Sequence, residues 1–317
     1  MVEEVTGFGG AQQGVGVDSG EGDVDEVIEL FRKLLGEPTT KKLMRWRGGD
    51  YYLIRFIKPR LNRLCTSGKC TLVEVFGGSG IVSQEADRDV FTNIIYNDID
   101  SRLVELYRAV KEKPKEFMAL LLVLPYGRFY YKLISKLLES GAKELAAIEL
   151  AAFTFYVANA KVHGGLGNGG FSYGVVPDET HARWLKSYAL AIPYIASKWA
   201  DITIENLDFR EVIDRYDRET TVFYLDPPYP DTADEYYSWY FTVHDLRDMA
   251  FMLRNIRGKF LLKLNERSYS YVSDLLPEHE YVIEKVEHWK FMDDISTIKR
   301  TGTNRKQITV FISSKTQ

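Results

Sequence analysis

Residues 70–80 read C-T-L-V-E-V-F-G-G-S-G, followed by I-V-S-Q-E-A-D-R at 81–88 and N-I-I-Y-N-D-I-D at 93–100. Aliphatic and aromatic residues favour a strand before the glycines and another at the end of this stretch, with a helix between them. A strand, a glycine turn, a helix and a strand are typical of a βαβ unit. We therefore predict an α/β fold.

The rest of the chain divides into sheet-like and helix-like parts. Further strands are expected at 202–206, 221–226, 259–264, 280–288 and 307–313, which gives a mostly parallel sheet that ends in an antiparallel pair. Apolar residues three and four apart instead indicate helices throughout 101–200. We predict a sheet domain over 23–100 and 201–317, starting near a helix at 24–35, with a helical domain inserted at 101–200.

Composition and the two termini set the broad class of protein. The 317 residues are 45% hydrophobic, and no apolar run approaches the roughly 20 residues needed to span a bilayer. The amino terminus lacks a basic segment followed by an apolar one, so we expect a cytoplasmic protein. Residues 1–22 are acidic and glycine-rich, which predicts a disordered tail. Cys65 and Cys70 have four residues between them and no nearby histidine cluster, so we expect ordinary thiols and no metal site.

The net charge of −4 conceals an uneven distribution. Residues 1–38 carry a net charge of −7, whereas 101–200 hold thirteen Lys or Arg and eight Asp or Glu, a net of +5. Such a concentration of positive charge is what a nucleic-acid-binding domain needs. A solvated helical face would give the same count.

Two strand ends carry candidate binding groups. The glycines at 77–80 lie between a strand and a helix, where a ligand can approach the backbone, although the G-x-G-x-x-G spacing is missing and a tight structural turn is the alternative. About twenty residues later, Asp98 ends the next strand and is placed to bind ribose hydroxyls. Together they indicate a nucleoside ligand.

A third strand end has unusual chemistry. Residues 222–229 read V-F-Y-L-D-P-P-Y, so a strand stops at an acid, two prolines and a tyrosine. The prolines stiffen the loop, which offers a carboxylate, a rigid carbonyl and an aromatic ring. A simple turn at the end of the strand is the alternative.

These motifs together resemble a known family. F-G-G-S-G (76–80), Y-N-D-I-D (96–100), N-L-D-F (206–209) and D-P-P-Y (226–229) look like those of the Dam-type DNA adenine methyltransferases, which use S-adenosylmethionine. L-M-R-W-R-G-G-D (43–50) is similar to the family's W-x-G-G-K, and T-N-R-K-Q-I-T-V-F (303–311) extends the likeness. The resemblance implies a Rossmann-like class I methyltransferase sheet with an inserted, mainly helical DNA-recognition domain.

The resemblance also implies a cofactor site, formed by residues outside the insert. Asp98 would hold the ribose hydroxyls and Ile99 would contact the adenine ring, while Asp208 would bind the adenine amino group with Phe209 beside it. One position departs from the family, because Asp50 stands where the family has lysine. The methionine part would be enclosed by Trp46, Phe76, Gly77, Gly78, Ser79 and Gly80.

In the D-P-P-Y loop, the family pattern implies the chemistry. Asp226 and the Pro227 carbonyl would accept the two N–H bonds of an adenine amino group, with Pro228 holding the loop stiff. Tyr229 would stack on the base, which must flip out of the duplex.

DNA contacts are expected from the insert and from both flanks. The glycine-rich 162–174 segment is predicted to be a hairpin or loop that reads DNA, with a plain surface loop as the alternative. The residues expected to contact phosphates or base edges are Arg45, Lys161, His163, Asn168, Ser172, Arg183, Lys299, Arg300, Arg305 and Lys306.

We thus predict a site-specific adenine methyltransferase that acts on double-stranded DNA as a monomer, with or without a cognate restriction endonuclease. Two alternatives remain open. One is methylation of the exocyclic amine of cytosine. The other is a DNA-binding pseudoenzyme, suggested by Asp50 and the acidic tail.

Overall fold

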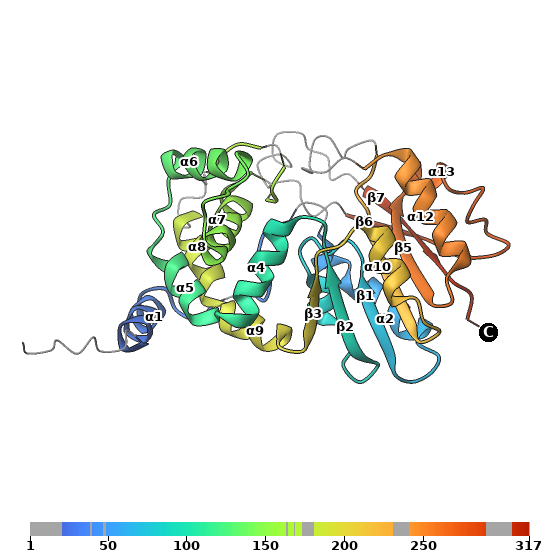
Figure 1. The fold of residues 1–317 in the computed structure, drawn as a ribbon, viewed down its shortest axis with the longest axis horizontal. Helices are drawn as coiled ribbons and strands as arrows, with labels where there is room; N and C mark the ends of the chain where they lie inside the picture. Colours follow the sequence, from blue (N-terminus) through green and yellow to red (C-terminus); the bar gives the residue numbers. More distant parts are fainter. Residues whose placement is uncertain are drawn as a thin grey trace, which may run out of the picture.

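A seven-stranded sheet forms one half of the molecule, beside a helical part (Figure 1). The computed structural model describes residues 21–38, 40–46, 49–162, 164–167, 169–172, 181–230, 241–289 and 306–316. The strand order is β3-β2-β1-β4-β5-β7-β6, and its first five strands follow the order of a doubly wound α/β fold. The strands are β1 (Cys70–Glu74), β2 (Phe91–Asn97), β3 (Ile202–Glu205), β4 (Thr221–Leu225), β5 (Lys259–Asn265), β6 (Val282–Trp289) and β7 (Lys306–Ser313).

The predicted pairing of the strands is confirmed. Strands β1 to β5 pair in parallel, and β7 lies antiparallel to both β5 and β6. A parallel sheet brings the carboxyl ends of its strands to one edge, where ligands bind in folds of this kind.

Each face of the sheet has its own hydrophobic core, because successive side chains of a strand point to opposite sides. Tyr224 and Leu261 point to one face, where they pack with helices that precede β4, whereas Phe223 and Leu262 point to the other. The first face is covered by α2 (Ile54–Leu64) and α3 (Ile81–Glu85), beside the short η1 (Asp50–Tyr52). The second is covered by α10 (Phe209–Tyr216) and α12 (Val243–Asn255), with α13 (Glu266–Ser270) after β5.

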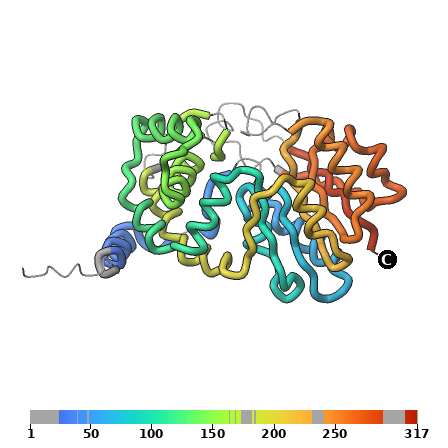
Figure 2. The backbone as a smooth tube through the Cα atoms, viewed as in Figure 1, coloured from blue at the N-terminus to red at the C-terminus, as the bar shows by residue number. Residues whose placement is uncertain are grey.

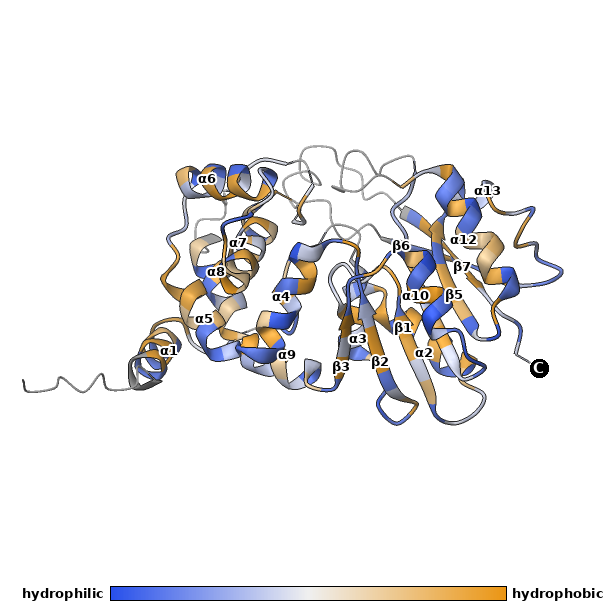
Figure 3. Ribbon diagram, in the orientation of Figure 1, coloured by the Kyte–Doolittle hydropathy of each residue, from blue (hydrophilic) through white to orange (hydrophobic). Residues whose placement is uncertain are grey.

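In the part that the structure describes, the segment between β2 and β3 contains helices and one isolated antiparallel bridge, between Lys161 and Phe171, but no strand. Figure 2 shows the chain leaving the sheet for this helical part and returning to it, and Figure 3 shows apolar residues along both parts. The central α7 packs against four other helices of the insert, and the insert shares one continuous core with the first face of the sheet. Its helices are α4 (Ser101–Glu112), α5 (Pro114–Val123), α6 (Arg128–Glu139), α7 (Ala147–Ala160), α8 (His181–Leu190) and α9 (Ile192–Trp199).

The amino-terminal helix α1 (Glu21–Leu35) packs against α5 and α8 of the insert. Its first two residues belong to the segment expected to be a tail, and the remainder of that segment, 1–20, lies outside the described residues. No helix in the described part of the chain has the length and apolar character to cross a membrane.

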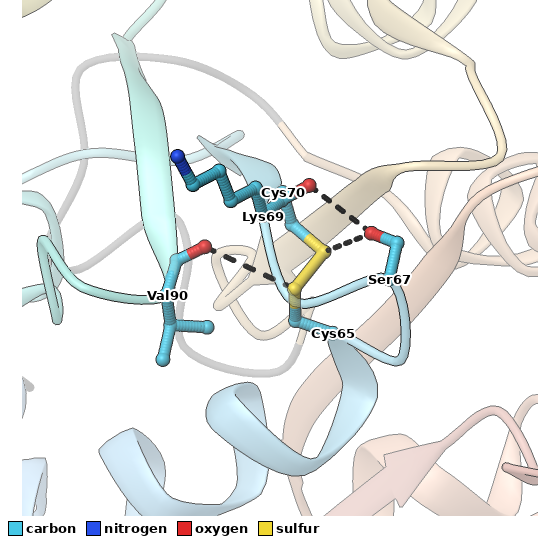
Figure 4. The surroundings of a disulfide bond; sticks show 5 residues. All are labelled: Cys65, Ser67, Lys69, Cys70 and Val90. Atoms are coloured by element: carbon cyan, nitrogen blue, oxygen red, sulfur yellow. Dashed lines mark hydrogen bonds between the residues drawn. A yellow bond between two sulfur atoms is a disulfide. The ribbon is translucent and has the colours of Figure 1, made fainter.

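The expectation of two ordinary thiols was wrong. Cys65 follows α2 and Cys70 begins β1, and the two form a disulfide (Figure 4). The loop between them turns back through Gly68, whose φ of 78° is in the left-handed region, and this brings the two Cα atoms to 5.8 Å. That separation suits a disulfide, but the spacing in the sequence does not reveal it.

Candidate active site

An open pocket lies at the carboxyl ends of β1, β2 and β4, with about 750 Å³ of space free of protein atoms. It is lined by aromatic, glycine and acidic residues from segments far apart in the sequence. The predicted site residues that line it are Trp46, Asp50, Phe76, Gly77, Gly78, Ser79, Asp98, Ile99, Asp226 and Pro228. The structure thus brings together the glycine loop, the Asp98 strand end and the D-P-P-Y loop.

The glycine loop is held in place from behind. Gly80 has a φ of 62°, and an added Cβ would come within 2.5 Å of the Trp199 ring, so this glycine has a structural role. Tyr96 donates its hydroxyl hydrogen to the Gly78 carbonyl at 3.1 Å, and Tyr107 donates to the Ser79 carbonyl. Two tyrosines, one on β2 and one on α4, therefore fix the loop that lines the pocket.

Asp98 is a half-buried carboxylate that directly follows β2. Its Oδ2 accepts a hydrogen bond from the Gly78 N–H at 2.7 Å, and its Oδ1 accepts one from the Asp100 N–H at 2.9 Å. Burial, with a smaller contribution from Asp100, raises the pKa of Asp98 to about 7. A carboxylate has about four acceptor sites, so lone pairs remain for ligand hydroxyls.

Asp226 occupies the corresponding position at the end of β4. Its side chain is 19% exposed, and burial raises its pKa to about 7 against the opposing effect of Lys263. The Oδ2 atom lies 2.6 Å from the Lys263 ammonium, while Oδ1 lies 3.5 Å from the Tyr229 hydroxyl. Pro228 lines the pocket, whereas Pro227 is buried.

Asp50, the departure from the family pattern, is buried at the start of η1. Its Oδ1 accepts a hydrogen bond from the Lys263 ammonium at 2.5 Å, and its Oδ2 accepts one from the Tyr224 hydroxyl. Lys263 was not among the site residues predicted from the sequence. The available signal was a lysine inside the apolar run F-L-L-K-L at 260–264.

Glu74, the last residue of β1, was also missed. It lines the pocket and is 2% exposed. Burial raises its pKa to about 8, although the Ser83 N–H and hydroxyl both donate to its Oε2 atom. Glu74 is therefore protonated for the most part at neutral pH. An acid at the end of the run C-T-L-V-E was the signal that could have found it.

The insert contributes to the pocket, contrary to our expectation. Leu103 of α4 and Leu166 and Gly167 of the glycine-rich segment are part of its lining. The Gly165 N–H donates to the Arg45 carbonyl at 3.1 Å, which ties this segment to the chain just before Trp46. The glycine-rich segment begins as the predicted hairpin, with an antiparallel bridge between Lys161 and Phe171.

Asp208 and Phe209 do not line the pocket. Asp208 caps the amino terminus of α10 and accepts a hydrogen bond from the Arg210 N–H at 2.9 Å. Phe209 is buried behind Phe76, with 5.8 Å between the ring centroids. Phe209 therefore supports the pocket wall from behind.

Lys161 does not lie where the DNA-binding prediction requires. It is 4% exposed, and its ammonium donates to the Gly167 carbonyl inside the hairpin. Burial lowers its pKa to about 8. Since an enclosed ammonium cannot reach a phosphate, this prediction is corrected: Lys161 holds the hairpin together.

The structure describes only some of the other residues that were predicted to contact DNA. Arg183 is exposed on α8, Ser172 is half-buried beside the hairpin base, and Arg45 is half-buried with its N–H donating to Asn159 at 3.0 Å. The described residues do not include His163, Asn168, Lys299, Arg300 or Arg305, nor the side chain of Lys306.

The sequence of this chain also matches a defined family. A family model described as D12 class N6 adenine-specific DNA methyltransferase matches residues 46–287. The chain belongs to this family. The match runs from the tryptophan before η1 to β6 and includes the whole pocket lining.

Individual relatives of this D12-class chain are similar over shorter stretches. It is 37% identical over 78 residues to the DNA adenine methylases of Escherichia coli K12 and Salmonella typhi. In each case the match covers 25% of this chain and 25% of the relative, so the chain matches about a quarter of the length of these relatives. Among solved structures, a precorrin-6y C5,15-methyltransferase from Geobacter metallireducens is 9% identical, with a TM-score of 0.35 over 83% of this chain and 88% of that one.

Proposed function

We propose that this protein transfers a methyl group from S-adenosylmethionine to the exocyclic amino group of adenine at specific sites in double-stranded DNA. The observation that carries the proposal is the meeting of two half-buried carboxylates, Asp98 and Asp226, in one pocket of a D12-class chain. We assign Asp98 to the nucleoside and Asp226 to the amino group.

The pocket residues fit S-adenosylmethionine by their chemistry. Asp98 offers acceptors for ribose hydroxyls, and Ile99, which is 39% exposed, offers an apolar surface for the adenine ring. Trp46 and the glycine loop line the same pocket as Asp226, and the methionine part would lie against them. When bound, the cofactor supplies an electrophilic methyl group on a positively charged sulfur.

The role of Asp226 follows from the chemistry of the substrate. The lone pair of the adenine amino nitrogen is delocalised into the ring, so the nitrogen is a poor nucleophile. Hydrogen bonds from the amino group to Asp226 Oδ1 and the Pro227 carbonyl would draw the nitrogen toward tetrahedral geometry and free its lone pair for attack. The same carboxylate favours departure of the proton that the nitrogen must lose.

Access to the amino group requires the base to leave the duplex. Flipping costs a few kcal/mol, and stacking on an aromatic ring returns roughly 1–3 kcal/mol per base. We assign this stacking to Tyr229, whose hydroxyl lies 3.5 Å from Oδ1 of the pocket-lining Asp226.

With Lys161 enclosed, the DNA surface moves to other residues of the insert. We propose Arg183 together with the exposed face of α6, which carries Arg128, Lys132 and Lys136 beside the 71% exposed ring of Phe129. Replacing Lys132 and Lys136 by Ala should lower the slope of log affinity against log salt by about 0.9 for each lost phosphate contact. An unchanged slope would remove α6 from the DNA surface.

The proposed function has a direct test. The protein is incubated with tritiated S-adenosylmethionine and duplex DNA, and the DNA is then digested to nucleosides. Label in N6-methyladenosine is expected. Label in methylcytidine would assign the enzyme to cytosine, and DNA binding without label would make it a pseudoenzyme.

A further inference from the structure

Lys263 is a charged residue in the middle of a buried strand. It lies on β5 between Leu262 and Leu264, which both belong to the core of the opposite face of the sheet. Because side chains alternate along a strand, Lys263 points to the first face. Its side chain is only 5% exposed. A buried ammonium is costly unless charged partners compensate for the lost water.

Two carboxylates provide that compensation. The Lys263 ammonium lies 2.5 Å from Asp50 Oδ1 and 2.6 Å from Asp226 Oδ2. Asp50 is fixed in turn by the Tyr224 hydroxyl on its other oxygen. A continuous chain of polar contacts therefore runs from Tyr224 through Asp50 and Lys263 to Asp226.

The contact with Lys263 gives the two carboxylate oxygens of Asp226 different partners. Oδ2 is engaged by the ammonium, whereas the contact of Oδ1 with the Tyr229 hydroxyl is long, at 3.5 Å. An amino group in the pocket would therefore meet Oδ1. Burial disfavours the charged form of Asp226, and Lys263 counteracts that effect. An acceptor of N–H bonds needs an oxygen that the donor can reach and a carboxylate that is ionised. The contact with Lys263 favours both.

We propose that Lys263 is a positioning residue for methyl transfer, which orients Asp226 and keeps it ionised, and that Asp50 is the counter-ion that holds Lys263 in place. This inference rests on the proposed function. It also explains the acid at position 50: the positive charge beside the D-P-P-Y loop comes from β5, and position 50 carries its partner.

The alternative is a purely structural ion cluster. Removing one member of a buried charged group destabilises a fold whatever its function, so a loss of stability alone cannot support the proposal. The discriminating measurement is the pH dependence of single-turnover methyl transfer, because it follows the ionisation of Asp226. Among the described residues, the titratable groups that face or surround Asp226 are Asp50, Glu74, Tyr224, Tyr229 and Lys263.

The two neighbours of Asp226 should shift that profile in opposite directions. In Lys263→Met the carboxyl loses an adjacent positive charge, so the acid limb of the profile should move to higher pH by about one unit or more. In Asp50→Asn the carboxyl loses a nearby negative charge, so the limb should move to lower pH. The rate of Lys263→Met at pH 7 should fall about 100-fold. Lys259→Met, on the same strand and the same side, is the matched control and should stay within about threefold of wild type.

A relocated lysine provides the second test. Asp50 Oδ1 lies within 2.5 Å of the Lys263 ammonium, so a longer side chain from position 50 can place an ammonium near the same point. Asp50→Lys combined with Lys263→Met should recover at least about tenfold of the rate lost in Lys263→Met. Thermal melts of every variant show which of them are folded.

The outcomes separate the two proposals. Opposite shifts of the pH profile, or rescue by the relocated lysine, support the role of Lys263. If Lys263→Met is folded and keeps the wild-type rate and profile, the inference is wrong. It is equally wrong if Lys263→Met does not fold and the folded Asp50→Asn leaves the profile unmoved. Absence of methyladenosine from the wild-type reaction would instead overturn the proposed function.

Discussion

The ends of β2 and β4 look alike in outline but differ in how each holds its acid. Asp98 and Asp226 each directly follow a parallel strand, and burial raises the pKa of each to about 7. Asp98 is fixed by the backbone N–H groups of Gly78 and Asp100, whereas Asp226 is fixed by the Lys263 ammonium. Main-chain N–H groups hold the acid at the end of β2, whereas a charged side chain holds the acid at the end of β4.

The difference matches what each carboxylate is proposed to do. Backbone donors hold an acceptor in a fixed direction without adding a charged side chain, which suits the binding of neutral hydroxyls. An ammonium also biases its partner toward the ionised form, which suits an acid that must accept hydrogen bonds from a reacting amino group. The comparison therefore predicts that Asp98, at the end of β2, governs cofactor binding and that Asp226, at the end of β4, governs the rate of methyl transfer.

The largest expected effect comes from the β4 end. Asp226→Ala removes the acceptor for the amino group, so single-turnover methyl transfer should fall at least about 100-fold. Cofactor and DNA binding should persist at least in part, because Asp98 and the insert are unchanged. The measurement is single-turnover label transfer at saturating cofactor and DNA. A variant that kept more than about a tenth of the wild-type rate would contradict this role for Asp226.

The next largest effect is expected at the end of β2. It should appear in the dissociation constant of the cofactor, not in the rate of methyl transfer. Asp98→Ala removes a charged acceptor from the ribose position, which should weaken cofactor binding about 10- to 100-fold. The single-turnover rate at saturating cofactor should change far less. Calorimetry with S-adenosylhomocysteine and with S-adenosylmethionine measures the affinity. If Asp98→Ala slowed the saturated rate as strongly as Asp226→Ala does, the division between binding and rate would not hold.

Glu74 at the end of β1, the strand between β2 and β4, sharpens the comparison because its carboxyl accepts hydrogen bonds from the Ser83 N–H and hydroxyl, whereas Asp226 accepts one from an ammonium. Burial raises its pKa from 4.5 to about 8. Between these pH values the folded state keeps a proton that the unfolded state releases, so this group makes the free energy of unfolding fall as pH rises. Glu74→Gln, which does not ionise, should remove this part of the decline, on the order of a few kcal/mol.

Urea unfolding of wild type and Glu74→Gln at pH 5, 7 and 9 tests this prediction. The variant should gain stability relative to wild type as the pH rises from 5 to about 8, and the difference should level off above that pH. Ser83→Ala is the informative control, because loss of the hydroxyl donor, with the backbone N–H retained, should raise the pKa of Glu74 further and extend the decline to higher pH. Parallel pH curves for wild type and Glu74→Gln would show that Glu74 is ionised in the folded protein at neutral pH.

The sequence predicted what depends on local pattern. Strand positions, the parallel order with its antiparallel end and the meeting of the 76–80, 98 and 226 segments follow from strand propensity, the glycine turn and the rule that parallel strands end at one edge. It did not predict contacts between side chains far apart in the chain. Asp50 and Lys263 are 213 residues apart, so no spacing rule could pair them.

Burial was the second quantity that the sequence could not supply. Lys161 precedes a glycine-rich run, which suggested an exposed loop. Its side chain is nevertheless buried, and its ammonium donates to the Gly167 carbonyl. In the same way, the insert was expected to stand apart from the cofactor site. Leu166 and Gly167 reach the pocket only because the hairpin folds toward the Arg45 backbone.

The smallest expected effect lies at the opposite edge of the sheet and serves as a control on the whole comparison. Cys70 begins β1, and Glu74 and the glycine loop come at the other end of the same strand. The Cys65–Cys70 disulfide closes a loop of only a few residues, so its removal should lower the free energy of unfolding by about 2 kcal/mol. Since the bond touches neither Asp98 nor Asp226, the double variant Cys65→Ser/Cys70→Ser should keep its cofactor affinity and its single-turnover rate.

The measurements are urea unfolding of wild type with and without reductant, unfolding of the double variant, and the two functional assays. Reductant should reproduce the loss in wild type and leave the double variant unchanged. A fall in cofactor affinity would mean that β1 transmits strain from its first residue to the glycine loop, and the strand ends could then no longer be treated as independent of the opposite edge.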